Sequence, residues 1–265
     1  MVTESRRIRS ISLGKHTASA EAEEELALDE PVCIFVNDEY HVTLIATPEL
    51  REELAAGYLL TQGIIESVKE IEGIEMDDGD VKVALTGAVD LREASVSMMN
   101  LIVTACGSSP RAKDSLMRLP EVSSDLRVEA SRLKDMITAL NSRSSVHRRT
   151  GGTHAAMLCS GEGEELAFAE DVGRHNAVDK VIGAHALKGG TFSECVLLST
   201  GRQSGEMVQK ACRVGVPVIA SMTVPLVSGV RLAEASGVTL TSLGGGRLRV
   251  YSGPQRIIEK MVGST

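Results

Sequence analysis

The chain is poor in aromatic residues and has no tryptophan. Of its 265 residues only 2% are aromatic, whereas 43% are hydrophobic, so the core must be built from aliphatic side chains and methionine. Few aromatics argue against a platform on which nucleic-acid bases stack. The net charge of −8 disfavours non-specific nucleic-acid binding, which depends on neutralising phosphates. We therefore expect no nucleic-acid partner.

Long apolar segments are also missing. No run approaches the roughly 20 apolar residues that span a bilayer, and the first 25 residues lack the apolar core of a secretory signal. We expect a cytoplasmic protein with no membrane partner.

The cysteines do not follow a disulfide or zinc pattern. The chain has five of them, an odd number, and no Cys-x-x-Cys occurs; they are Cys33, Cys106, Cys159, Cys195 and Cys212. Scattered cysteines in a chain without a signal are typical of reduced thiols. The missing pair spacing argues against structural zinc.

Strand and helix patterns alternate from residue 154 onwards, which predicts an α/β fold with parallel strands covered by helices. The polar, basic segment 142–153 is interpreted as a joint. We therefore expect a flexible lead-in over residues 1–28, in which residues 6–13 can form an edge strand. An N-terminal α+β subdomain over 29–145 and a C-terminal subdomain over 146–265 would follow.

Turn and cap residues predict the local structure. Asn37-Asp38 suits the turn of a hairpin, and a helix is expected to begin with Thr47 as its cap and to end at Gly63. A second helix is expected over residues 129–141, and a third over 174–187, after a hairpin that starts at His154.

Cys106 stands in the sequence TACGSSPRAK, directly after a short apolar run. Gly107 and the two serines let the backbone bend and present N–H groups, while Arg111 and Lys113 supply positive charge. Both features favour a thiolate, the reactive form of cysteine. The other four cysteines lie in or beside apolar elements and are interpreted as buried.

The segment from Thr150 to Lys180 concentrates groups that are costly to bury, as at a ligand site. Thr150, Gly151 and Gly152 can form an amide-lined anion site or a plain tight turn. Arg174 can bind phosphate with both arms of its guanidinium group.

Other residues of this segment have two interpretations. Asp171 can hold the amide edge of a guanine or cap the helix that begins at residue 174. Asp179 and Lys180 are expected in a surface ion network. His154 and His175 lack partners at metal-binding spacing, so we expect no metal site.

Three consecutive glycines, 244–246, precede Arg247 and a strand that contains Tyr251. They suit a phosphate loop or a hairpin turn, and the pattern alone does not decide between these.

Taken together, these residues resemble the FdhD/NarQ family, the formate dehydrogenase accessory sulfurtransferases. The similarity runs from about residue 30 to residue 253. It is carried by EELAAGYLLTQGII (52–65), Cys106-Gly107, TGGTHAA (150–156), EDVGRHNAVDKVIG (170–183), EMVQKACRVGVPVIAS (206–221) and RLRVYSGP (247–254).

The resemblance implies a sulfurtransferase. A cysteine desulfurase would pass sulfur to Cys106 as a persulfide, and the sulfur would move to a molybdenum or tungsten bis(guanine dinucleotide) pterin destined for formate dehydrogenase. No resident metal is implied, and a homodimer is expected. The residues implied to bind the guanine nucleotide moieties of this cofactor are Thr150, Gly151, Gly152, His154, Asp171, Arg174, His175, Asn176, Arg247, Leu248, Arg249, Val250, Tyr251 and Ser252.

The implied fold is a cytidine deaminase-like, three-layer C-terminal subdomain with a smaller N-terminal α+β subdomain. Deamination itself is not expected, because Ala156 stands where the deaminase motif His-x-Glu has its acid. Ser109 stands where many family members have a second loop cysteine, so relay between two loop thiols is unavailable. The alternatives are a cofactor-binding chaperone without sulfur transfer and an unrelated nucleotide-binding enzyme.

Overall fold

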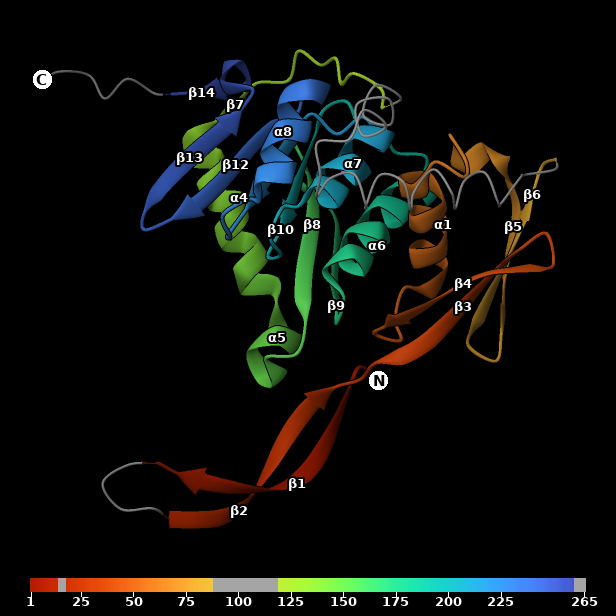
Figure 1. Cartoon of the computed structure of the whole chain (residues 1–265), viewed down its shortest axis with the longest axis vertical. Coiled ribbons are helices and arrows are strands. Elements are labelled where there is room, and N and C mark those ends of the chain that lie inside the picture. The colour runs from red at the N-terminus through yellow and green to blue at the C-terminus, as the bar shows by residue number, and fades with distance from the viewer. Residues whose placement is uncertain (14–17, 88–118, 260–265) are drawn as a thin grey trace, which may run out of the picture.

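The computed structural model describes residues 1–13, 18–87 and 119–259. A six-stranded sheet forms the centre of the body (Figure 1). Its strands are β8 (His154–Ser160), β9 (Glu165–Asp171), β10 (Cys195–Ser199), β11 (Val218–Ser221), β12 (Thr239–Gly244) and β13 (Arg247–Ser252). They lie in the order β13-β12-β11-β10-β8-β9, in which β10, β11 and β12 are parallel and the other pairings are antiparallel.

Helices cover both faces of this sheet. The helices that pack around it are α4 (Ala130–Arg143), α6 (Arg174–Leu187), α7 (Gly205–Val214) and α8 (Val227–Ser236). Successive side chains along each strand point to opposite faces of the sheet, so the core consists of two clusters, one on each face. Leu158 and Leu197 belong to the same cluster as residues of α6 and α7, whereas Met157 and Leu198 pack with α4. The mixed α/β architecture that the sequence predicts is confirmed.

A smaller sheet completes the body. It has the order β4-β3-β6-β5, and its strands are β3 (Glu30–Val36), β4 (Glu39–Ala46), β5 (Ile71–Asp77) and β6 (Asp80–Leu85). Shorter elements are the 3-10 helices η1 (Val68–Glu70) and η2 (Pro254–Arg256), helix α5 (Ser145–Thr150), and the paired strands β7 (Val128–Glu129) and β14 (Ile257–Ile258).

Helix α1 (Arg51–Gln62) packs directly on α6, and two glycines permit the close approach. A Cβ atom on Gly57 would lie 1.8 Å from the carbonyl oxygen of Asp179, and one on Gly183 would lie 1.9 Å from that of Glu53. A side chain at either position would push the helices apart. This contact holds the N-terminal elements against the C-terminal half.

Several local predictions are confirmed. Gly63 ends α1 in the left-handed conformation with φ 71°, as the sequence indicates. The turn at Asn37-Asp38 joins β3 to β4, and α6 spans the predicted residues 174–187.

Within the expected lead-in, the edge strand anticipated over residues 6–13 corresponds to β1 (Thr3–Ser12), which pairs with β2 (Ala18–Ala27). This hairpin extends away from the body in Figure 1. The cap predicted for the first helix is wrong. Helix α1 begins after Leu50, with no side-chain cap, because Thr47 is engaged elsewhere. Among the residues that the structure describes, no helix is long and apolar enough to cross a membrane.

Candidate functional site

Chain reversals bring the polar segments of the sequence to one edge of the six-stranded sheet. The parallel strands β10, β11 and β12 end there, and β8 begins there with His154, which pairs with Asp171 at the end of β9. Helices α6, α7 and α8 follow β9, β10 and β11, so their amino ends also point to this edge. Ligands of such sheets bind at the carboxyl ends of the parallel strands.

Arg174 is a half-buried cation at this edge. It is the first residue of α6, and its Nε is buried without a hydrogen-bond partner. Its stem packs on the loop after β10, where a Cβ on Gly201 would lie 2.9 Å from the Cβ of Arg174. Glycine at position 201 therefore leaves room for the arginine, whose guanidinium group suits an anion.

Two histidines lie near Arg174. Burial and the charge of Arg174 lower the pKa of His154, whose Nδ1 is 3.4 Å from the hydroxyl of Thr200. His175 is more strongly affected, because burial, Lys210 and Arg174 lower its pKa to about 4.

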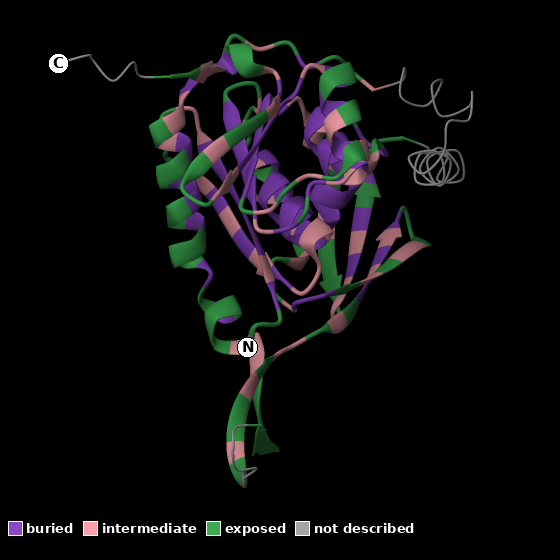
Figure 2. Ribbon diagram, turned by 60° about the vertical axis from the view of Figure 1, so that its left-hand side comes forward, coloured by how far each residue is buried: buried purple, intermediate pink, exposed green. Residues whose placement is uncertain are grey.

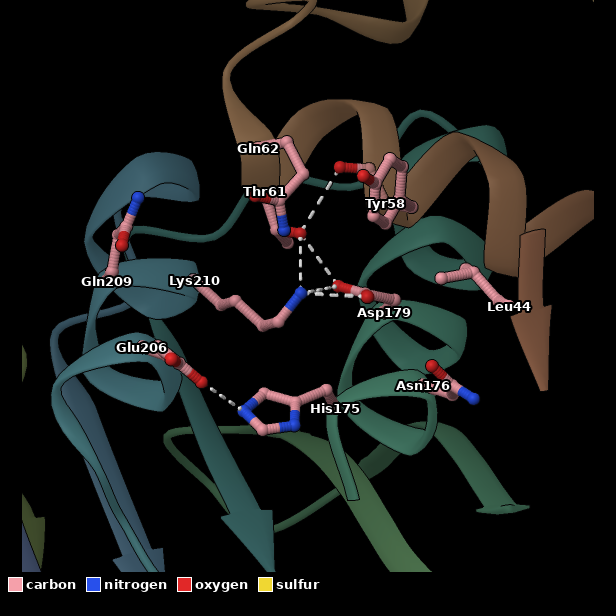
Figure 3. A pocket seen from close by; sticks show the side chains of 10 residues that line it. All are labelled: Leu44, Tyr58, Thr61, Gln62, His175, Asn176, Asp179, Glu206, Gln209 and Lys210. Carbon is pink, nitrogen blue, oxygen red and sulfur yellow. Dashed lines mark hydrogen bonds and ion pairs between the residues drawn. The ribbon is translucent and has the colours of Figure 1, made fainter. Parts of the chain in front are cut away.

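Glu206 of α7 contacts His175, with its Oε2 3.0 Å from Nε2 (Figure 3). The carboxylate does not keep the imidazole charged, because desolvation and nearby cations oppose protonation. His175 is therefore neutral near pH 7, with one ring nitrogen facing a carboxylate.

Asp171 lies in the interior and not on the ligand-facing surface. It is fully buried, and its carboxylate accepts hydrogen bonds from the N–H groups of Thr47 and Gly173 and from the Asn176 side chain. It also forms an ion pair with Lys180, whose Nζ is 2.6 Å away. These contacts hold the turn before α6 through Asp171 and Asn176.

The surface ion network expected for Asp179 and Lys180 is wrong, because both side chains are buried. Lys180 also donates to the backbone oxygen of Thr47 at 2.8 Å. Thr47 accepts from the N–H of Val172 through its hydroxyl. The threonine expected to cap α1 thus joins the smaller sheet to the start of α6.

Asp179 forms a second buried ion pair, which the sequence did not indicate. Both of its oxygens are 2.8 Å from Nζ of Lys210 on α7, and the hydroxyl of Thr61 on α1 donates to Asp179 at 2.7 Å (Figure 3). The sequence feature that could have indicated this pair is Lys210, a basic residue among the mostly apolar residues 207–212. The pair lines a cavity of about 200 Å³ between α1, α6 and α7, which His175 and Glu206 also line.

The segment 150–152 forms a helix end. Gly151 ends α5 with φ 66°, and its N–H donates to the carbonyl of His147. The N–H of Gly152 donates to the hydroxyl of Thr150 at 3.1 Å. Both amides that were expected to hold an anion are used internally, so the geometry is that of the tight turn.

Strand β13 carries the last group of candidate residues. Arg247 is exposed at the ligand-facing edge, opposite Gly244, and Arg249 donates to the Gly244 carbonyl at 3.2 Å. Leu248 is half-buried and packs on the same hydrophobic cluster as α4. From Val250 onwards the strand runs away from this edge.

Tyr251 and Ser252 have internal partners. The Tyr251 hydroxyl lies 3.2 Å from that of Ser242, and Ser252 is buried and donates to the carbonyl of Val238.

Cys106, the candidate sulfur carrier, and Ser109 lie outside the described residues. Of the other cysteines, three are buried, and burial raises the pKa of Cys159 to about 12 and those of Cys195 and Cys212 to about 11. Cys33 is half-buried and accepts a hydrogen bond from Thr43. Over residues 1–13, 18–87 and 119–259, no group of three or more His, Cys, Asp or Glu side chains is arranged to hold a metal ion.

Comparison with known proteins gives relatives that match along most of the chain. The model of the FdhD/NarQ family matches residues 27–258. A protein of Thermoplasma acidophilum named sulfur carrier protein FdhD is 33% identical over 96% of this chain and 94% of its own length. A protein of the same name from Methanothermobacter thermautotrophicus is 36% identical over 89% of this chain and 92% of its own.

A solved structure extends the similarity to three dimensions. A crystal structure of a candidate formate dehydrogenase accessory protein from Desulfotalea psychrophila superimposes with a TM-score of 0.79 and 28% identity. The match covers 97% of this chain and all of that one. The chain therefore belongs to the FdhD/NarQ family.

Proposed function

We propose that this protein is a sulfur carrier that works through Cys106. It accepts a sulfur atom from a cysteine desulfurase and delivers it to a molybdenum or tungsten bis(guanine dinucleotide) pterin before insertion into formate dehydrogenase. The relatives named sulfur carrier protein FdhD support the sulfur chemistry, and the structural neighbour supports the accessory role.

The observation that carries the assignment to Cys106 is the state of three of the other four thiols; the fourth, Cys33, is half-buried and accepts a hydrogen bond from Thr43. A thiol with a pKa of about 11 or 12 has almost no thiolate at pH 7, and Cys159, Cys195 and Cys212 are in that state because of burial. Cys106 has the opposite surroundings in sequence, with glycine, two serines and two basic residues beside it.

The loading step is thiolate exchange. The Cys106 thiolate attacks the outer sulfur of the persulfide on the desulfurase, a new S–S bond forms, and the old bond breaks to release the thiolate of the donor. Delivery breaks the same bond: a nucleophile of the acceptor supplies an electron pair to the outer sulfur and forms a bond to it, and the Cys106 thiolate leaves. A single cysteine is sufficient for this cycle, so Ser109 does not prevent it.

The edge of the larger sheet is the proposed binding site for the cargo. The guanidinium group of Arg174 can neutralise a phosphate of the dinucleotide tails, and neutral His154 and His175 can donate or accept hydrogen bonds. Arg247 adds an exposed cation at this edge. The helices on both faces of the sheet are compatible with the cytidine deaminase-like fold that the resemblance implies, and we place the protein in the cytoplasm as a homodimer.

Intact-mass measurement tests the proposal. After incubation with a cysteine desulfurase and cysteine, the wild-type chain is expected to gain one sulfur atom, and Cys106→Ser is expected to gain none. Cys212→Ser is the matched control, and it should load like the wild type. Loading of Cys106→Ser at Cys159 or Cys212 would contradict the site assignment.

The second candidate function is a chaperone that holds the cofactor without sulfur chemistry. The sheet edge around Arg174 favours the chaperone, because binding of the cofactor at that edge requires no thiol. Formate dehydrogenase maturation in cells that carry Cys106→Ala separates the two functions. Full activity of the client enzyme supports the chaperone, whereas loss of activity supports the sulfur carrier.

A further inference from the structure

The hairpin of β1 and β2, here called the arm, has no core of its own. Its ten-residue strands leave the body and extend into solvent (Figures 1 and 2). None of its described residues belongs to either hydrophobic cluster of the body. At its base, Glu25 accepts from Arg149 at 3.0 Å, and Ala27 packs on Gly152.

The strand register divides the arm into two unlike faces. One face, the polar face, carries the pairs Ser5–Glu25, Arg7–Glu23 and Arg9–Glu21, with a single exposed aliphatic residue, Ile11, nearer the tip. The other, the small face, carries mostly small and aliphatic residues, with charges only toward the base of the arm: Glu4, Arg6, Ile8, Ser10, Ala20, Ala22, Glu24 and Leu26.

The small face is open to solvent. Leu26 is 43% exposed, and Ile8 and Ala22 are only half-buried. An isolated two-stranded ribbon is marginally stable in water, and further strands or packing against a helix are needed to stabilise it. The arm is thus an amphipathic ribbon whose apolar side has no partner in its own chain among the described residues.

The charges of the two strands decide how a second copy can approach. Strand β1 carries Arg6, Arg7 and Arg9, whereas β2 carries four glutamates between residues 21 and 25. Edge-to-edge pairing of β1 with β1, or of β2 with β2, around a two-fold axis would oppose like charges, which is destabilising. Association through the faces does not have this penalty.

A two-fold axis parallel to the strands makes the small face complementary to itself. Rotation about this axis swaps the left and right strands of the ribbon, so β1 of one copy lies over β2 of the other. Arg6, which forms an exposed ion pair with Glu4 of its own strand at 2.9 Å, is the register partner of Glu24, so Arg6 of each copy faces Glu24 of the other. In the same way Ile8 faces Ala22, and the small side chains permit close stacking of the two ribbons.

We propose that two copies of this chain associate through the small faces of their arms, as a four-stranded, two-layer contact. This contact rests on the homodimer of the proposed function and supplies the surface through which the two copies bind. It does not depend on sulfur transfer. The contact is small, so the dimer is expected to dissociate on dilution.

Sedimentation or light scattering of the full chain, without donor or cofactor, tests the surface. Wild type is expected to shift from 28.2 kDa toward twice that mass as its concentration rises. Arg6→Glu alone and Glu24→Arg alone should each weaken the dimer about tenfold or more, because each places like charges across the axis twice.

Mixing the two variants is the decisive measurement. In a mixed dimer the introduced glutamate of one copy faces the introduced arginine of the other, and the unchanged Glu24 faces the unchanged Arg6. Both contacts then join opposite charges, so association is expected to return to the wild-type level. Mixing does not change the like charges that positions 6 and 24 carry within the arm of each variant. Recovery of the dimer on mixing must therefore come from contacts between the two copies. Glu23→Arg is the matched control, since it reverses the neighbouring charge on the polar face and should leave the dimer intact.

The other outcomes overturn the inference. A wild-type chain that stays monomeric at its highest soluble concentration removes both the homodimer and the arm contact. A dimer that persists in Arg6→Glu and Glu24→Arg keeps the homodimer and removes the arm as its surface. Equal weakening by Glu23→Arg, or no recovery on mixing, also contradicts the face assignment. Sulfur loading of the same samples reports separately on Cys106.

Discussion

The inner and outer parts of the polar segment 170–180 behave as two different regions. On the inner side, Asp171 with Lys180 and Asp179 with Lys210 form ion pairs with almost no exposed surface. On the outer side, Arg174 and His175 remain half-buried, and the Nε of Arg174 has no partner. One motif therefore supplies both the scaffold and the site, and changes to the two regions should affect different measurements.

Lys180→Met is expected to have the largest effect. It leaves the carboxylate of Asp171 buried without its cation, which costs about 3–5 kcal/mol in free energy of unfolding. Urea denaturation measures the loss. Lys82→Met is the control, because its pair with Asp77 is on the surface and should contribute little. Similar losses in both variants would remove the distinction between the inner pairs and ordinary surface pairs.

Gly183→Ala tests the helix contact that buries the inner region. Its Cβ would meet the Glu53 carbonyl at 1.9 Å, so α1 and α6 must separate, and we expect a loss of about 1–3 kcal/mol in unfolding free energy. Gly73→Ala introduces the same methyl group where nothing lies within 4 Å. Comparable thermal unfolding of the two variants would show that close packing of α1 on α6 is not required.

Arg174→Ala is expected to change binding and leave folding intact. Loss of one charge-assisted contact to phosphate should weaken guanosine diphosphate binding about tenfold in calorimetry. Arg132→Ala, at the opposite end of the sheet beside Glu162, serves as the control. Unchanged affinity in Arg174→Ala would exclude the sheet edge as the nucleotide site, and a large loss of stability would place Arg174 in the scaffold.

The smallest expected effect is on the pH dependence of stability, through the titration of His175. Its pKa is about 4 in the folded chain and near 6.5 when unfolded, so the unfolded chain binds more protons between these values. Stability contributed by neutral His175 is therefore present above pH 6.5 and is lost as pH falls toward 4. The facing groups are Glu206 and Lys210 on α7, with Arg174 and His154 nearby.

His175→Gln should reduce this loss by about 1 kcal/mol, because the imidazole is partly exposed and screened. Chemical denaturation of both proteins between pH 7 and pH 4 measures the difference. Parallel stability curves would mean that His175 titrates as an ordinary surface histidine.

Much of the fold was predictable because local signals are strong where elements begin and end. The bounds of α6 follow from the glycine before it and the helical run after it, and Gly63 ends α1 as expected. The hairpin that begins at His154 is also present as predicted. In the arm, a strand over residues 6–13 was anticipated, but its partner β2 was missed because that strand is rich in glutamate and no core pattern marks it.

The candidate site was only partly predictable. The types of residue indicated a polar centre, but Asp171, Asp179 and Lys180 appeared in sequence as surface or ligand groups. They are buried because α6 lies between the larger sheet and α1, and that contact depends on Gly57 and Gly183 from distant segments. A local sequence pattern does not indicate which distant residue will pair with a charged side chain in the interior.

The sequence by itself determined the alternation of strands and helices, the helix ends, the reduced thiols as an expectation, and the motifs that resemble the FdhD/NarQ family. These properties depend on neighbouring residues and on backbone preferences. Only the tertiary structure decided which charges of the polar segment pair in the interior and which face the sheet edge. That choice depends on desolvation, and desolvation is set by elements that meet from opposite ends of the chain.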